Sequence, residues 1–143
     1  LTDLFTTYFP IDLTGVNGEN LSDTPVTDAI DMHKSPSGTG ASVVTNQLVL
    51  TLKITPGTTT SVTLFCSESD TGTVAAMAKI NRCPSGTCGP DERTYTLSNY
   101  ATVSGVKWIT ARFDVKQKWV ACTLDDAANG TGTVVVTGTR SWQ

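Results

Sequence analysis

Cys83 and Cys88 have a spacing that suits either a metal-binding knuckle or a disulfide. Four residues separate them in "CPSGTC", and thiolates about two to four residues apart are typical of one half of a structural zinc site. The other two cysteines, Cys66 and Cys122, lie far apart in the sequence, so the chain offers no second knuckle. We therefore expect no metal site and no cofactor.

Disulfides are the favoured chemistry for these four thiols. The small turn-forming residues between Cys83 and Cys88 can bring their Cα atoms within about 6 Å, as a disulfide requires. Cys66 and Cys122 fall on corresponding apolar faces of two predicted strands, so they either bridge these strands or remain buried free thiols. An even cysteine count favours pairing in an oxidising setting.

Groups for acid, base or nucleophilic catalysis are sparse. His33 is the single histidine, and it lies in a polar stretch as an expected solvated loop residue. The carboxylate neighbours Asp91–Glu92 and Asp125–Asp126 adjoin Gly, Pro or Ala in turn-like sequence, which predicts exposed loop carboxylates in preference to a calcium site or a glycosidase pair. No nucleophile elbow or phosphate-binding loop is present. We expect that the protein is not an enzyme.

Exposed aromatic side chains are the candidate contacts for a ligand or a partner. Trp108 and Arg112 share one face of a predicted strand, opposite Ile109 and Phe113, so Trp108 is partly exposed if the side of Ile109 and Phe113 faces the core. Exposed Trp and Tyr serve as stacking platforms in sugar-binding modules, and Tyr95 and Tyr100 lie in a neighbouring predicted strand. We favour the alternative, in which Trp108 packs beneath the N-terminal segment or in the second sheet.

The composition favours strands. Charged residues make up 16% of the chain, against a usual value of about 25%. The chain contains 26 Thr and 11 Ser, and β-branched Thr fits a half-buried pleated surface. A net charge of −3 argues against nucleic-acid binding as a main role, and no apolar run approaches the roughly 20 residues that span a membrane.

Alternating apolar and polar residues predict about seven strands separated by short turn sequences. We expect an all-β antiparallel sandwich of Ig-like or jelly-roll type. The first two strands are joined by "TPGTT" and are predicted to form a hairpin, with Pro56–Gly57 at the centre of a type II turn. The alanine-rich segment 74–81 would also tolerate a helix. The predicted strands are 47–55, 61–67, 74–81, 93–100, 105–116, 117–124 and 132–142.

Residues 1–42 differ from the predicted sandwich of residues 43–143. Their polar part, rich in Asp, Asn, Ser, Gly and Pro, has no sustained period, and such a stretch is uncommon inside a compact domain. We expect an extended N-terminal arm that binds a neighbouring subunit or adds a strand to a sheet edge, or a first strand in the chain's own sheet. Leu1 is expected to follow a processing cut or an artificial boundary. The apolar residues of this assembly arm are Leu4, Phe5, Tyr8, Phe9, Ile11 and Leu13.

The segment 78–95, "AKINRCPSGTCGPDERTY", resembles the loop between the last two sheet strands of single-stranded RNA bacteriophage coat proteins. There a cysteine pair flanks a small polar turn, and neighbouring loops meet at the symmetry axes of the capsid. The resemblance covers about twenty residues. Because those coats end in two helices, whereas this chain ends in predicted strands, we interpret the likeness as convergent turn chemistry.

These features together predict a structural subunit of a viral or extracellular assembly, such as a coat, decoration or fibre protein. The chain is expected to form a homo-oligomer through its N-terminal arm and sheet edges, in the extracellular space or in a virion. The alternative is a secreted binding module that recognises a carbohydrate or a cell surface through Trp108, Tyr95 and Tyr100.

Overall fold

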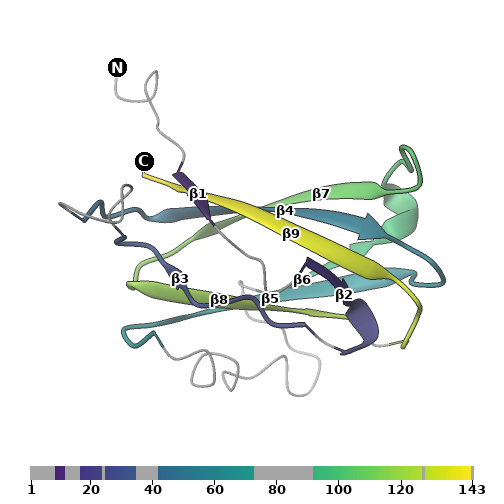
Figure 1. Ribbon diagram of the computed structural model, residues 1–143, viewed down its shortest axis with the longest axis horizontal. Helices are drawn as coiled ribbons and strands as arrows, with labels where there is room; N and C mark the ends of the chain where they lie inside the picture. Colours follow the sequence, from purple (N-terminus) through teal and green to yellow (C-terminus); the bar gives the residue numbers. More distant parts are fainter. Residues whose placement is uncertain are drawn as a thin grey trace.

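The computed structural model describes residues 9–11, 17–23, 25–34, 42–72, 92–126 and 128–142. Within these ranges the chain forms nine strands and two short 3-10 turns, η3 (Leu21–Asp23) and η5 (Leu97–Asn99). The strands stack in two layers (Figure 1), which confirms the predicted all-β class. They are β1 (Phe9–Ile11), β2 (Asn17–Asn20), β3 (Ile30–Asp31), β4 (Gln47–Thr55), β5 (Ser61–Ser69), β6 (Glu92–Thr96), β7 (Lys107–Asp114), β8 (Trp119–Asp125) and β9 (Thr133–Ser141).

Each layer is an antiparallel sheet. Sheet A contains β1, β9, β4 and β7 in that order, and β2 pairs with β9 further along the same edge. Sheet B contains β3, β8, β5 and β6 in that order. The long strands β4 and β5 therefore lie inside their sheets, each between two partners.

Consecutive strands mostly lie in different sheets. The chain crosses from sheet B to sheet A between β3 and β4, returns to sheet B at β5, and crosses again at each step from β6 to β9. Strands that are far apart in the sequence consequently lie side by side, as β4 does with β9 and β5 with β8. This arrangement buries the apolar faces of both sheets against each other.

The predicted hairpin between the first two long strands is wrong, because β4 lies in sheet A and β5 in sheet B. The turn between them is an arch across the sandwich, in which Thr59 N donates to Pro56 O at 2.8 Å. Gly57 and Thr58 occupy its centre, one residue later than predicted, and Gly57 has the expected positive φ of 50°. The arch is held by contacts with Asp126, Thr131 and Gly132, which local turn chemistry does not reveal.

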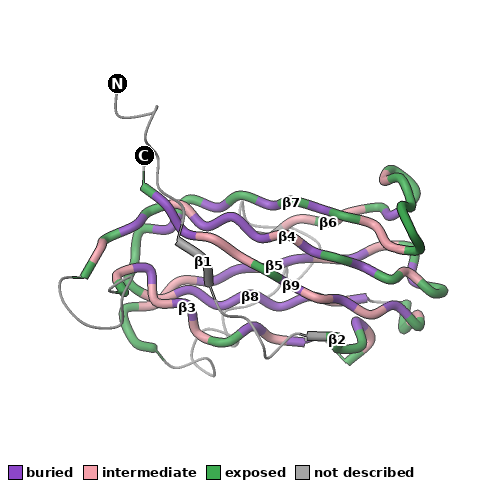
Figure 2. Tube along the Cα trace, turned by 45° about the horizontal axis from the view of Figure 1, so that its top comes forward, coloured by how far each residue is buried: buried purple, intermediate pink, exposed green. Residues whose placement is uncertain are grey.

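The core is built by the alternation that the sequence shows. Buried positions alternate with exposed positions along β7 (Figure 2), and one apolar cluster joins Leu50 and Leu52 of β4 to Leu64 of β5 and Leu124 of β8. The strands β4, β5, β7, β8 and β9 lie where the pattern predicts them. The predicted strand 74–81 lies outside the described residues.

The described parts of residues 17–34 also belong to the sandwich. Leu21, Ile30 and Met32 are at most 2% exposed and lie in the core, and β2 and β3 pair with β9 and β8. Over these parts the segment packs with the chain's own sheets, and the extended arm is not confirmed. Residues 1–8, 12–16 and 35–41 lie outside the described ranges, and for them the arm stays a prediction.

Candidate functional site

Trp108 stands on the outer face of sheet A, where 51% of its surface is exposed. β7 positions it there, because buried residues such as Ile109 and Phe113 alternate along this strand with exposed residues, and Trp108 is one of the exposed residues. Arg112 lies on the same face, as the alternation predicts, with Thr110 between it and Trp108.

Neighbouring strands add hydroxyl groups and a second cation beside Trp108. Lys53 of β4 is the direct partner of Trp108 across the sheet. Thr51 of β4 and Thr137 of β9 continue the row of Thr110. We call these residues the outer face: Trp108, Thr110, Arg112, Lys53, Thr51 and Thr137.

A cation–π contact orients the indole of Trp108. The Nζ atom of Lys53 lies 5.5 Å from the ring centroid, a contact worth about 0.5–1 kcal/mol at an exposed site. An exposed indole beside hydroxyl groups and cations can stack on the apolar face of a sugar ring or on an apolar side chain of a partner.

Tyr95 and Tyr100 do not join Trp108 on the outer face. Both are partly buried and pack against the core, with their ring centroids 6.3 Å apart in an edge-to-face arrangement. Lys107 fixes this corner by donating from Nζ to Tyr100 O at 2.6 Å. The structure thus brings Trp108 and Arg112 to one face and separates them from the two tyrosines.

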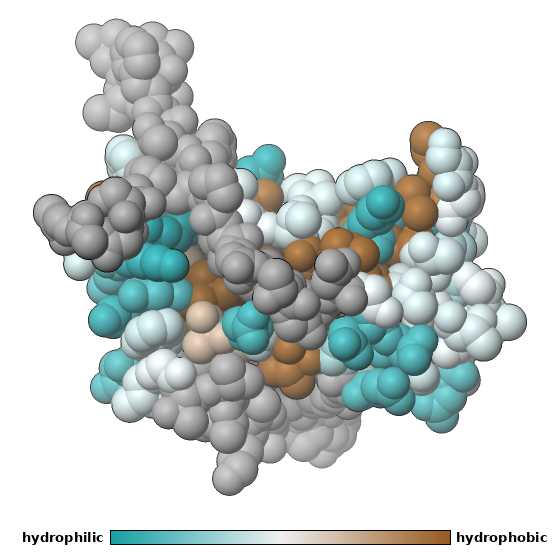
Figure 3. Space-filling view, viewed as in Figure 1, coloured by the Kyte–Doolittle hydropathy of each residue, from teal (hydrophilic) through white to brown (hydrophobic). Residues whose placement is uncertain are grey.

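In the view of Figure 3, most hydrophobic atoms gather toward the middle of the molecule, and polar residues surround them. Among the described residues, the large apolar side chains with high exposure besides Trp108 are Val44, Val103 and Trp142. Single exposed apolar residues are normal on soluble proteins. The outer face combines an exposed indole with hydroxyl groups and cations.

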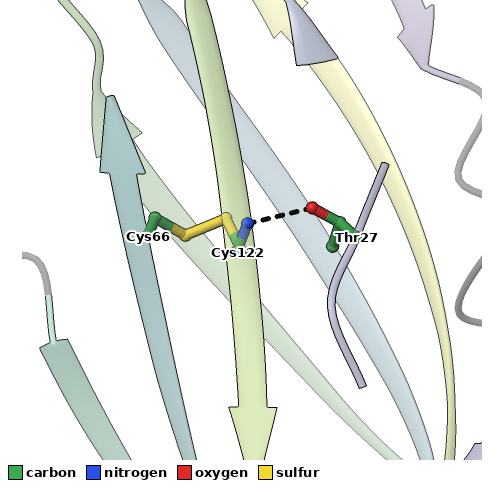
Figure 4. The surroundings of a disulfide bond; sticks show 3 residues. All are labelled: Thr27, Cys66 and Cys122. Atoms are coloured by element: carbon green, nitrogen blue, oxygen red, sulfur yellow. Dashed lines mark hydrogen bonds between the residues drawn. A yellow bond between two sulfur atoms is a disulfide. The ribbon is translucent and has the colours of Figure 1, made fainter. Parts of the chain in front are cut away.

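Cys66 and Cys122 form a disulfide. Of the two predicted states for this pair, a bridge or buried free thiols, the structure has the bridge. They are direct partners across β5 and β8, so the bridge lies within sheet B and faces the core. Figure 4 shows Thr27 on the other side of β8, where its Oγ1 accepts from Cys122 N at 2.9 Å. Cys83 and Cys88, and with them the predicted second bridge, lie outside the described residues.

Arg140 is a buried cation that the sequence analysis missed. It is 3% exposed on β9, and its Nη1 atom donates to Val43 O at 2.8 Å and to Met32 O at 3.0 Å. Its Nη2 atom donates to Lys34 O. Burial lowers the pKa of the Arg140 guanidinium from its usual value, and the nearby charge of Asp31 opposes this shift.

Asp126 is buried at 1% exposure, so its prediction as an exposed loop carboxylate is wrong. Its Oδ2 atom accepts from Thr59 Oγ1 at 2.6 Å and from Gly130 N at 2.8 Å, and its Oδ1 atom accepts from Ala128 N at 3.1 Å. These donors satisfy the carboxylate inside the loop that it organises. Its role in the described structure is to fasten residues 126–132 to the arch before β5.

The predicted assembly arm is described in part. Phe9 and Ile11 lie in β1, which pairs with residues Gly138–Arg140 of β9. Leu4, Phe5, Tyr8 and Leu13 lie outside the described ranges. The backbone thus places one piece of this segment along the edge of sheet A.

Within the ranges that the structure describes, no three side chains of His, Cys, Asp or Glu are grouped so that they could hold a metal ion. The same part of the chain has no helix with the length and apolar character needed to cross a membrane.

Comparison with known proteins identified no matching family model, no similar curated protein and no similar solved structure.

Proposed function

We propose that the protein is a structural subunit of a viral or extracellular assembly, such as a coat, decoration or fibre protein. The observation that carries this proposal is the pairing order of the strands. β1 and β2 pair with β9, β3 with β8, β4 with β7 and β5 with β6, which makes one long antiparallel ribbon. Wrapping this ribbon brings β4 beside β9 and β5 beside β8.

This order supports a jelly roll over an Ig-like sandwich. A jelly roll has roughly eight strands in two sheets and is the fold of many viral capsid and lectin domains. β1 and β2 together serve as one interrupted edge strand of sheet A. A fold alone does not assign a function. The edge strands and the disulfide give further support for this one.

The N-terminal strands support association by strand exchange. β1 and β2 are only three and four residues long, and both occupy the edge of β9. A short edge strand is held by few hydrogen bonds, so the same strand of a neighbouring copy can replace it at little cost. The arm prediction then applies to β1 and the residues before it.

The Cys66–Cys122 disulfide supports an extracellular or virion setting. Disulfides persist in secreted proteins and at virion surfaces and are rare in reducing compartments. A covalent bridge within the sandwich also suits a protein that must keep its shape outside the cell.

The proposal is tested by light scattering after size-exclusion chromatography. We compare the full chain with variants that lack residues 1–8 or 1–16, because the first keeps β1 and the second removes it. The full chain and the shorter deletion are expected to elute with masses of several chains, and the longer deletion as a smaller species. A full chain that stays monomeric at every concentration would overturn the assembly function.

A glycan-binding module is the second candidate, and the exposure of Trp108 favours it. A glycan screen is expected to give hits that Trp108→Ala abolishes and that Trp142→Ala, at another exposed tryptophan, leaves unchanged. Blank screens, or equal hits for both variants, would remove this candidate.

A further inference from the structure

We propose that β7 is a docking edge for a second copy of this chain, paired antiparallel about a two-fold axis at Thr110. This contact is separate from the edge of β9 and adds the partner and register of a second interface to the assembly proposed above, on which it rests.

β7 has a partner on one side only within the described residues. On that side all eight of its residues pair with β4 without a shift in register, from Lys107 opposite Ile54 to Asp114 opposite Gln47. On its other side the structure describes no paired strand. Such an edge presents a row of N–H and C=O groups that can template another strand.

The other sheet edges are short, irregular or carry an inward-turned charge, whereas β7 is long and regular. Proteins protect edges by shortness, bulges, Pro or inward-turned charges. β3 and β1 have two and three residues, and β2 has a register shift between Asn17 and Glu19. On β6, Arg93 lies 4.2 Å over the ring of Phe113 and places a charge at the sandwich opening. β7 has eight residues without Pro or Gly.

The side chains of β7 fit a second copy of β7. Directly opposite residues of an antiparallel pair lie on the same face, with Cβ atoms about 4.5–5.5 Å apart. If Thr110 faces its own copy, Trp108 of each strand lies opposite Arg112 of the other. A guanidinium over an indole is a favourable cation–π pair, and the two-fold axis makes this contact twice.

The register centred on Ala111 is less favourable. Centring the pair on Ala111 would place Asp114 opposite Trp108, and the negative face of an aromatic ring does not attract a carboxylate. The inward side also agrees with the Thr110 centre, because Ile109 then lies opposite Ala111 and extends the apolar layer across the axis. Pairing at Thr110 joins two copies of sheet A into one continuous sheet.

A cysteine cross-link tests both the edge and the register. Opposed Cα atoms at the axis lie within the range of about 4.4–6.8 Å that a disulfide spans, so Thr110→Cys is expected to give a covalent dimer on mild oxidation, seen by non-reducing electrophoresis. Thr137→Cys is the matched control, since Thr137 is exposed in the same row but two strands from the edge. The unsubstituted chain measures the background from Cys83 and Cys88.

Charge reversal tests the cation–π contacts in the reversible dimer. Arg112→Glu is expected to raise the dissociation constant about tenfold or more, because it replaces both cations that face an indole. Lys116→Glu makes the same change of charge at an exposed residue beyond the end of β7, and we expect no such loss.

The outcomes separate this inference from the function on which it rests. Assembly in light scattering without a Thr110→Cys cross-link above background refutes the β7 edge and leaves the assembly function standing. Equal cross-linking of Thr137→Cys also refutes the edge, because it indicates random collision. A specific cross-link that persists after removal of residues 1–16 supports the edge even if strand exchange at β9 fails.

Discussion

Asp126 shows how single polar residues fix the loops of this sandwich. Its carboxylate is nearly inaccessible, and it accepts three hydrogen bonds from Thr59, Ala128 and Gly130. Burying a charge is costly unless such donors replace water. The bonds therefore determine the path of the loop between β8 and β9.

Replacing Asp126 with Ala is expected to lower the free energy of unfolding by about 3 kcal/mol, because Thr59 Oγ1 and the N–H groups of Ala128 and Gly130 lose a charged acceptor. Guanidinium unfolding monitored by circular dichroism measures the change. Asp70→Ala, at an exposed aspartate, serves as the control and is expected to change stability by less than about 0.5 kcal/mol. Equal losses in both variants would contradict this role of Asp126.

The sequence predicted the faces of residues better than the roles of polar groups. Cys66 follows the alternation of its strand, so its burial could be predicted. The alternation also turns Trp108 outward, and the favoured prediction that Trp108 packs beneath the N-terminal segment or in the second sheet was wrong. Arg140 and Asp126 are polar residues that the fold buries, and their partners lie far away in sequence, such as Met32 and Thr59. Neither spacing nor composition indicates such partners, because they depend on which strands become neighbours.

At the scale of elements, the arch between β4 and β5 is locked to the loop before β9. Thr58 N donates to Thr131 Oγ1 and Thr131 N donates to Thr58 Oγ1, each at 2.9 Å. Gly57 permits this approach, since a Cβ atom there would lie 2.2 Å from Thr131 Oγ1. The arch and the loop therefore stabilise each other.

Gly57→Ala is expected to lower the free energy of unfolding by about 3 kcal/mol, from backbone strain at positive φ and from loss of the two Thr bonds. Gly105→Ala is the matched control, because Gly105 also has a positive φ, of 82°, but has open space around it. Gly105→Ala is expected to lower the free energy of unfolding by about 1 kcal/mol, from backbone strain alone. Thermal and guanidinium unfolding of both variants checks the difference, and equal costs would contradict the locked arch.

Arg140 ties the segment between β3 and β4 to β9. Arg140→Ala is expected to lower the free energy of unfolding by about 3 kcal/mol, because the carbonyl groups of Met32, Lys34 and Val43 all lose a charged donor. Hydrogen exchange should also accelerate at Thr45, whose N–H bonds to Met32 O at 2.9 Å in this segment. Arg112→Ala on the outer face is the control, and unchanged exchange in Arg140→Ala would contradict the tie.

Long strands were predictable, and short ones were not. β4 and β7 carry eight or nine residues of alternation, whereas β3 has two residues and gives no period. The sequence also did not indicate which of the two sheets each strand joins. A turn such as that around Gly57 can close a hairpin or an arch, and only contacts between distant segments decide which one forms.

At the scale of the whole molecule, the N-terminal third contributes to the core as well as to an edge. Leu21, Ile30 and Met32 are buried among residues of both sheets. Burying each side chain contributes about 2 kcal/mol. Their sum is comparable with the total stability of about 5–15 kcal/mol that domains have.

A chain without residues 1–42 is therefore expected to be unfolded, and a chain without residues 1–16 to remain folded. Circular dichroism and thermal unfolding of the two deletions check this expectation. A cooperative transition of the larger deletion near that of the full chain would show that this segment is dispensable for folding.

The disulfide constrains the unfolded chain. Cys66 and Cys122 are 56 residues apart, and closing a loop of this length stabilises the fold by about 4 kcal/mol. The double variant Cys66→Ala and Cys122→Ala is expected to lose this amount in guanidinium unfolding. Reductant should destabilise the parent chain by a similar amount and leave the double variant little changed; a large effect on the double variant would assign the stabilisation to other cysteines.

The pairing of β1 with the end of β9 has a mechanical consequence. Phe9 lies opposite Arg140, so the outer ends of these two strands lie at the same end of sheet A (Figure 1). A pulling force on those ends would load one residue pair at a time and peel β1 away. In sheet B, the covalent bridge between β5 and β8 prevents the chain between its cysteines from lengthening. Tension would thus detach β1 from the edge of sheet A first, whereas the chain between Cys66 and Cys122 could not extend.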